Sequence, residues 1–148
     1  MNDNILKIKW HTGGAEINLV AFFPCGQREL KRLLRMMDLE PETKQENVKA
    51  CINYLKTASN ILECNMEEYS RRYFKYKLIY AERRERINSR KWPSGLPITK
   101  DEITKLRQDS RFASDMWHDA ERTYKKCQRA QKRVIKNLDY LQKLGEST

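Results

Sequence analysis

The chain has 148 residues, of which 34% are charged and 9% are aromatic, and its formal charge is +10. This length fits one domain with a modest core, and the charged fraction favours a thin helical structure with much solvated surface. The aromatic content argues against intrinsic disorder. No stretch approaches the ~20 apolar residues of a membrane span, and Lys7 and Lys9 interrupt the apolar run that a signal peptide would need. We therefore expect a cytoplasmic protein without a membrane partner.

The positive charge is unevenly distributed along the chain. Residues 1–42 carry six basic and six acidic side chains, residues 43–98 carry 12 and 6, and residues 99–148 carry 12 and 8. The net charges of these segments are therefore 0, +6 and +4. A basic surface favours polyanions, either nucleic acid or an acidic protein face.

The four cysteines form no Cys-x-x-Cys pair and no close cluster; they are Cys25, Cys51, Cys64 and Cys127. Cys127 lies on an apolar stripe, as a small core residue would. We expect four reduced thiols, as is usual in a cytosolic protein, with a disulfide as the alternative.

The first 42 residues predict a β-hairpin followed by a short helix. Apolar and polar side chains alternate over residues 5–10 and again over 15–23, and a turn is expected at 11–14 because it contains Gly13 and Gly14. Residues 27–38 place Leu30, Leu33 and Leu34 on one helical face. Pro41 is expected to close this part of the chain.

Two long helices are predicted after Pro41. Each opens with a Thr-x-x-Glu capping box, at 43–46 and at 99–102. Apolar residues then recur at alternating spacings of three and four, as along the contact line, or seam, of a coiled coil. In the first helix the seam residues are Val48, Ile52, Leu55, Ser59, Leu62, Met66, Tyr69, Tyr73, Tyr76, Tyr80, Arg83 and Ile87. In the second they are Ile103, Leu106, Ser110, Ala113, Trp117, Ala120, Tyr124, Cys127, Gln131, Val134, Leu138 and Leu141.

Residues 90–97 break the helical pattern with two prolines and a glycine. Equal helix lengths and a short break favour an antiparallel fold-back. We therefore predict a mainly α protein with a minor α+β part. Residues 1–42 are expected to form a β-hairpin and a short amphipathic helix. Residues 43–148 are expected to form a long antiparallel two-helix coiled-coil hairpin, with helices at about 43–89 and 99–144. The polar seam residues Arg83, Ser110 and Gln131 are expected to fix the register of the two helices.

An apolar stripe lies opposite the seam of the first long helix. We call Phe74, Leu78 and Ala81 the outer stripe. Either the N-terminal module, a second copy of the chain or another protein has to cover it. The N-terminal module, tethered at residue 43, reaches the strip formed by Cys51, Tyr54, Ala58 and Ile61 more easily, so the outer stripe is a candidate partner surface by elimination.

Tyr69, Tyr73, Tyr76 and Tyr80 admit two interpretations. Beside Arg71, Arg72, Lys75 and Lys77 they could stack on nucleic-acid bases. Their spacing instead favours filling of the seam, with the hydroxyl groups reaching water.

Two basic regions are candidate sites for nucleic acid or for an acidic protein surface. At the end of the hairpin, Arg83, Arg84, Arg86, Arg90 and Lys91 lead into Trp92, which either binds a partner or caps the seam. Along the last helix the second region, the basic stripe, contains Lys125, Arg129, Lys132, Arg133 and Lys136. A stripe of this kind would follow a phosphate backbone without reading its sequence.

No pattern of residues indicates catalysis. The two histidines, His11 and His118, have no second histidine beside them as a metal ligand, and no P-loop, G-x-S-x-G or H-E-x-x-H motif occurs. We expect no enzyme activity, no metal and no cofactor.

These features favour a binding protein that docks on a protein or nucleoprotein partner through the outer stripe and Trp92. Sequence-nonspecific binding of DNA or RNA by the basic regions is the alternative, and pairing of two hairpins into a homodimer also stays open. In its small size, basic charge and lack of motifs the chain resembles the accessory and inhibitor proteins of phages and mobile elements, such as anti-CRISPR proteins. That resemblance implies inhibition of a host nuclease complex in the host cytoplasm.

Overall fold

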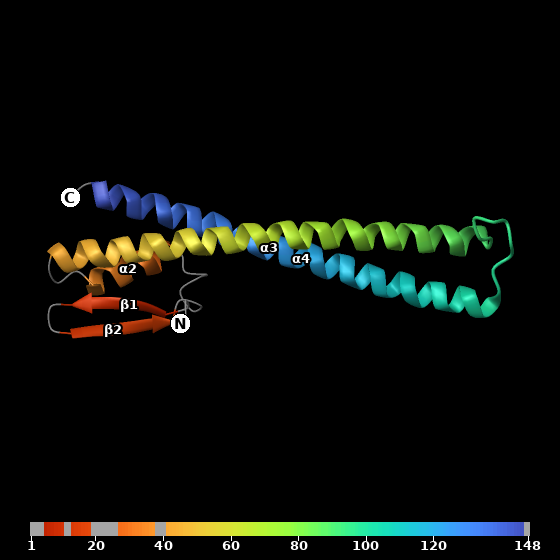
Figure 1. The fold of residues 1–148 in the computed structure, drawn as a ribbon, viewed down its shortest axis with the longest axis horizontal. Helices are drawn as coiled ribbons and strands as arrows, with labels where there is room; N and C mark the ends of the chain where they lie inside the picture. Colours follow the sequence, from red (N-terminus) through yellow and green to blue (C-terminus); the bar gives the residue numbers. More distant parts are fainter. Residues whose placement is uncertain (1–4, 11–12, 19–26, 38–40, 147–148) are drawn as a thin grey trace. The chain divides into compact units, whose positions relative to one another are not determined.

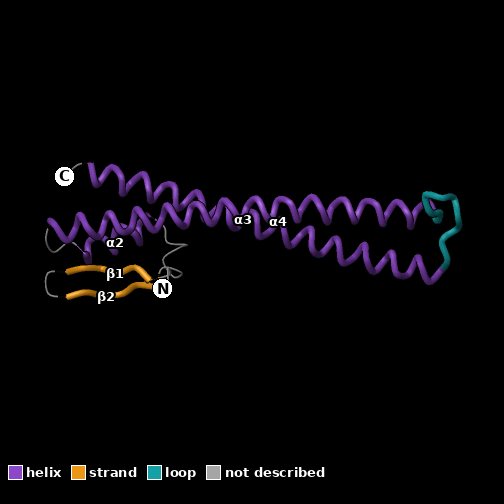
Figure 2. The backbone as a smooth tube through the Cα atoms, in the orientation of Figure 1, coloured by secondary structure: helices purple, strands orange, loops and turns teal. Residues whose placement is uncertain are grey.

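The computed structural model describes residues 5–10, 13–18, 27–37 and 41–146. In chain order the elements are β1 (Ile5–Trp10), β2 (Gly13–Asn18), α2 (Gln27–Met37), α3 (Pro41–Ser89) and α4 (Lys100–Glu146), as Figure 1 shows. The prediction of a mainly helical chain with two long helices packed as a hairpin is confirmed (Figure 2). The chain forms two compact units: residues 1–64 with 127–148, and residues 65–126. The predicted domain boundary after residue 42 stays a prediction.

Helix α3 begins two residues earlier than predicted. It starts at Pro41 rather than after a cap at Thr43, so the predicted role of Pro41 as a terminator is wrong. Proline suits the first turn of a helix, because its fixed φ is already helical and its missing N–H would have no intrahelical partner there. Thr43 therefore lies inside the first turn.

The second capping box is confirmed in atomic detail. The Glu102 amide donates to Thr99 Oγ1 over 3.2 Å, and the Thr99 amide donates to Glu102 Oε1 over the same distance. These reciprocal bonds satisfy two backbone donors that the helix itself cannot pair. Helix α4 therefore begins at Lys100, as the sequence predicts.

The first unit is organised around a core to which α2, α3 and α4 all contribute. Its buried apolar residues are Leu30, Leu34, Val48, Cys51, Leu55, Leu62, Val134 and Leu141. Leu30 and Leu34 come from α2, so the short helix contacts the strip near Cys51 that the sequence assigned to the N-terminal module. Gln131 Nε2 donates to Ser59 Oγ over 2.8 Å and joins α4 to α3 within this core.

Strands β1 and β2 pair antiparallel, with Ile8 opposite Ala15 and Trp10 opposite Gly13. Gly13 and Gly14 therefore belong to β2 and not to the predicted turn, because the pairing leaves two residues between the strands. Strand β1 contacts α2. The predicted turn residues 11–12 and the predicted strand end at 19–23 lie outside the described residues.

The second unit is the part of the hairpin that contains the connection between α3 and α4. Its buried seam residues are Ile87, Ile103, Leu106, Ser110, Ala113 and Ala120. In the middle of α4, the buried Ala113 and Ala120 lie about one helical turn to either side of Trp117, which Tyr73 and Tyr80 of α3 contact. Ile87, Ile98, Ile103 and Leu106 form a separate apolar cluster beside the connection, and Trp92 packs against it.

Candidate docking surface and basic tip

An aromatic cluster occupies the middle of the second unit. The ring centroid of Trp117 lies 6.1 Å from that of Tyr73 and 5.7 Å from that of Tyr80, and His118 stacks on Trp117 at 4.6 Å. Lys77 Nζ donates to Tyr73 Oη over 3.3 Å and lies over the Trp117 ring. These tyrosines therefore fill the contact between the helices, as the seam interpretation predicts, and do not form an open ladder for bases.

The outer stripe faces solvent in the described part of the chain. Phe74 is 64% exposed, Leu78 is 71% exposed, and Ala81 is also exposed. The Phe74 ring meets Tyr73 edge-on at 5.1 Å, so one edge of the phenyl group is held by the aromatic cluster while its remainder is open. Two large apolar side chains one helical turn apart present a surface that costs free energy to leave in water.

A groove adjoins Phe74 between α3 and α4. It has a volume of about 320 Å³ and is lined by Ser70, Tyr73, Phe74, Glu121, Tyr124 and Lys125. Lys125 forms an ion pair with Glu121 over 3.1 Å, so the wall from α4 carries both charges. A partner side chain could enter this groove beside Phe74. The sequence marked Phe74 and Lys125 but missed the groove, because its shape depends on how the two helices pack.

Phe112 is a second exposed aromatic residue that the sequence analysis missed. It is 59% exposed, and its ring meets Tyr76 edge-on at 6.2 Å. The available signal was a large apolar residue outside the seam positions of the second long helix.

The connection between the helices, residues 90–99, which we call the tip, has a defined backbone. The Trp92 amide donates to the Leu96 carbonyl and the Gly95 amide to the Trp92 carbonyl, over 2.9 and 2.8 Å. This is the pattern of a three-residue hairpin loop, Pro93-Ser94-Gly95, with glycine in the left-handed region at φ 88°. Trp92 is half-buried against the apolar cluster. Hydrogen bonds to the backbone and the hydroxyl of Thr99, and then to the side chain of Trp92, lower the pKa of Glu102. This packing is what the seam-cap interpretation of Trp92 predicts, and the predicted partner contact of Trp92 stays a prediction.

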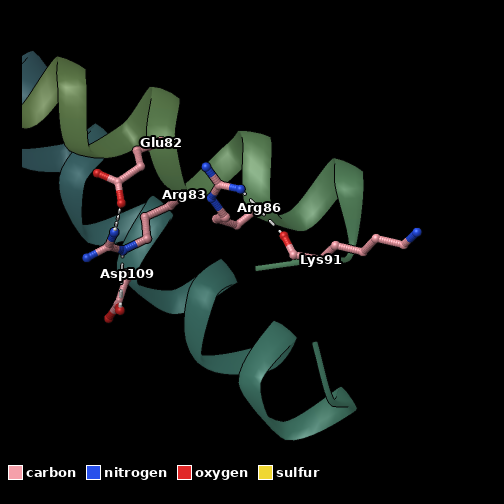
Figure 3. A network of polar contacts seen from close by, with 5 residues as sticks. All are labelled: Glu82, Arg83, Arg86, Lys91 and Asp109. Atoms are coloured by element: carbon pink, nitrogen blue, oxygen red, sulfur yellow. Dashed lines mark hydrogen bonds and ion pairs between the residues drawn. The ribbon is translucent and has the colours of Figure 1, made fainter. Parts of the chain in front are cut away.

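Two of the predicted cationic residues beside the tip are engaged within the chain (Figure 3). Arg83 pairs with Glu82 over 3.0 Å and with Asp109 of α4 over 3.9 Å. Arg86 Nη1 donates to the Lys91 carbonyl over 3.5 Å, and the Lys91 side chain extends away from this network. The predicted role of Arg83 in fixing the register is consistent with its bridge to Asp109.

Three other cations are exposed, one before the tip and two within it. Arg84, Arg90 and Lys91 are exposed, and none of them forms an ion pair with another described residue. The structure thus divides the predicted basic cluster into two arginines that are engaged within the chain and three side chains whose charge is unneutralised.

The predicted basic stripe of α4 is mixed in character. Lys125 is paired with Glu121 and lies in the second unit, whereas Arg129, Lys132, Arg133 and Lys136 lie in the first. Arg133 is also engaged with other groups. Arg129, Lys132 and Lys136 are exposed and form no ion pair among the described residues.

The described residues contain no group of three or more His, Cys, Asp or Glu side chains that could hold a metal ion. Burial raises the pKa of the Cys51 thiol to about 11, which makes a reactive thiolate scarce at neutral pH. Cys51, Cys64 and Cys127 are free thiols, and Cys25 lies outside the described residues.

No helix in the described ranges combines the length and the apolar character needed to cross a bilayer. No protein family, curated protein or solved structure matches this chain.

Proposed function

We propose that this chain is a non-catalytic cytoplasmic binding protein that docks on a protein or nucleoprotein partner through the outer stripe. The observation that carries the proposal is the exposure of Phe74 and Leu78 beside an open groove. Interface anchors are commonly large apolar side chains that enter a pocket or border one. A narrower form of the proposal, by analogy with anti-CRISPR proteins, is an inhibitor of a host nuclease complex encoded by a phage or mobile element.

The charge around the stripe supports electrostatic steering of the partner. Residues 65–126 carry 16 basic and 10 acidic side chains, a net charge of +6. An acidic partner face would approach faster than a neutral one, and two copies of this unit would repel each other. A heterologous acidic partner therefore fits the surface better than a homodimer.

The test is affinity capture from nuclease-treated lysate of the source cells or their host, with the double variant Phe74→Asp/Leu78→Asp. We expect the wild type to retain a partner and the variant to lose it while its thermal melt is unchanged. Ile135→Asp is the matched control, since Ile135 is 54% exposed on α4 in the first unit. Equal capture by wild type and variant would overturn the proposal. A collapsed melt would do the same, because it would show that the stripe is internal.

A second candidate function is sequence-nonspecific binding of DNA or RNA along α4. The unpaired and exposed Arg129, Lys132 and Lys136 favour it. Neutralising these three residues should then weaken binding of random-sequence nucleic acid at low salt.

A further inference from the structure

The tip holds its unneutralised cations on a fixed backbone. The Arg90 amide donates to the Arg86 carbonyl over 2.9 Å, which ends α3, and the Ile98 amide donates to the Arg90 carbonyl over 3.0 Å. Lys91 forms an isolated antiparallel bridge with Pro97. Arg90 and Lys91 therefore lie on one side of a small hairpin. Backbone hydrogen bonds join its two sides at Arg90 and at Trp92.

This small hairpin packs against an apolar cluster. Ile98 is 8% exposed, and with Ile87, Ile103 and Leu106 it forms the cluster on which Trp92 packs. Because the backbone is already ordered, a ligand that binds here does not have to supply the free energy of ordering a loop.

Arg90 occupies a conformation that favours glycine. Its φ is 56°, in the left-handed region, where the residue after a helix end is most often glycine. A side chain there costs roughly 1–2 kcal/mol relative to the right-handed conformation. Local backbone chemistry therefore gives no reason for an arginine at this position, whereas a contact with an external anion does.

We propose that the tip is a phosphate-binding clip for the backbone of a nucleic acid, with Arg84, Arg90 and Lys91 as the phosphate contacts. The inference is independent of the docking function of the outer stripe. Arginine donates in a planar fork that matches phosphate oxygens, and lysine adds a point charge.

The surroundings of these cations favour nucleic acid over an acidic protein. Trp92 is partly buried against the apolar cluster, and Leu96, 65% exposed, is the one large apolar side chain that the described tip presents to solvent. A protein interface needs a larger apolar centre than one leucine. Because the described tip has no exposed aromatic side chain that could stack on bases, contacts there fall on the phosphate backbone and binding is independent of sequence.

The number of phosphate contacts can be obtained from the dependence of the binding constant on salt concentration. With three contacts to single-stranded DNA, the logarithm of the binding constant should fall with that of the salt concentration at a slope of roughly −2, or about 20-fold weaker binding for a fourfold increase in salt. Each contact removed should reduce the slope by about 0.7.

The experiment is fluorescence anisotropy of the full chain with a labelled mixed-sequence DNA oligonucleotide at several salt concentrations. Arg90→Gly should reduce the slope by about 0.7 and melt no lower than the wild type. The triple variant Arg84→Gln/Arg90→Gly/Lys91→Gln should lose about 2 from the slope. The matched control, Lys49→Gln/Lys56→Gln/Arg111→Gln, removes the same charge from exposed residues outside the tip and outside the basic stripe, and it should keep the slope.

Two results would overturn the inference. If the tip triple and the control triple weaken binding equally, net charge and not the tip binds the DNA. If polyglutamate of equal charge competes with the oligonucleotide as well as unlabelled DNA does, the tip is a site for acidic protein and not for phosphates.

Discussion

The two left-handed residues of the tip should respond in opposite directions to substitution. Arg90 has φ 56° and Gly95 has φ 88°. Arg90→Gly relieves a conformational cost of roughly 1–2 kcal/mol, offset by the roughly 0.5–1 kcal/mol of extra chain entropy that glycine loses on folding. The net expectation is a stability gain of about 0.5–1 kcal/mol. Gly95→Ala should lose about 1 kcal/mol from conformation alone, because a Cβ built at Gly95 meets nothing within 4 Å.

The assay is urea unfolding followed by far-ultraviolet circular dichroism, with thermal melts in parallel. For a chain of this size about 1 kcal/mol corresponds to a shift of roughly 2–4 °C in Tm. Arg84→Gly is the matched control, since Arg84 lies inside α3 and the same substitution there should lose about 1 kcal/mol. If Arg90→Gly is as destabilising as Arg84→Gly, then the Arg90 side chain supports the fold, and the argument that its charge is kept for an external anion is refuted.

Two further predictions concern the hydrogen bonds that fix the helices. Thr99→Ala should destabilise the protein by about 1 kcal/mol at neutral pH by removing the cap. The Thr99 hydrogen bonds lower the pKa of Glu102 in the folded state. The stability difference between wild type and Thr99→Ala should therefore shrink as the pH falls from the ordinary glutamate pKa through the lowered value. Urea titrations at neutral and acid pH test this, and a pH-independent difference would contradict it. For Ser59 and Gln131, a double-mutant cycle with alanine should give a coupling of about 0.5–1.5 kcal/mol in the free energy of unfolding, whereas additive losses would mean that their 2.8 Å bond does not stabilise the contact.

Periodicity predicted the helical hairpin because the contact between two helices needs a buried side chain at every third or fourth position. Leu55, Val134 and Leu141 are almost fully buried, and each occupies a predicted seam position. Gln131 also lies on the seam and needs a polar partner there, and Ser59 provides one; that this pair fixes the register stays a prediction. The start of α3 was missed because Thr43 and Pro41 both carry helix-start signals, and the sequence does not rank them.

The candidate sites were only partly predictable, because exposure and pairing depend on side-chain direction. Arg83 and Arg84 are adjacent in sequence, yet only Arg83 reaches Asp109, since successive residues on a helix point in different directions. The same limit applies to Trp92, for which a partner contact and a cap of the seam were equally consistent with the sequence. The left-handed conformation of Arg90 could not be predicted, because a positive φ is expected from sequence mainly at glycine.

The outer stripe and the tip lie in the same unit but use different chemistry, so their functions can be separated. Phe74 and Leu78 offer apolar surface on one face of α3, and Arg90 and Lys91 offer charge at its end. Fully burying such apolar side chains contributes about 1.5–3 kcal/mol each, which their exposed fractions of 64% and 71% reduce to about 1–2 kcal/mol each. The stripe variant should therefore lose roughly 30- to 1,000-fold in affinity for a protein partner while its salt-dependent DNA binding persists. The triple tip variant should show the converse, a loss of DNA binding with the protein partner retained. If either variant abolishes both activities, the two surfaces form one binding site, and a nucleoprotein complex would then be the ligand that contacts both.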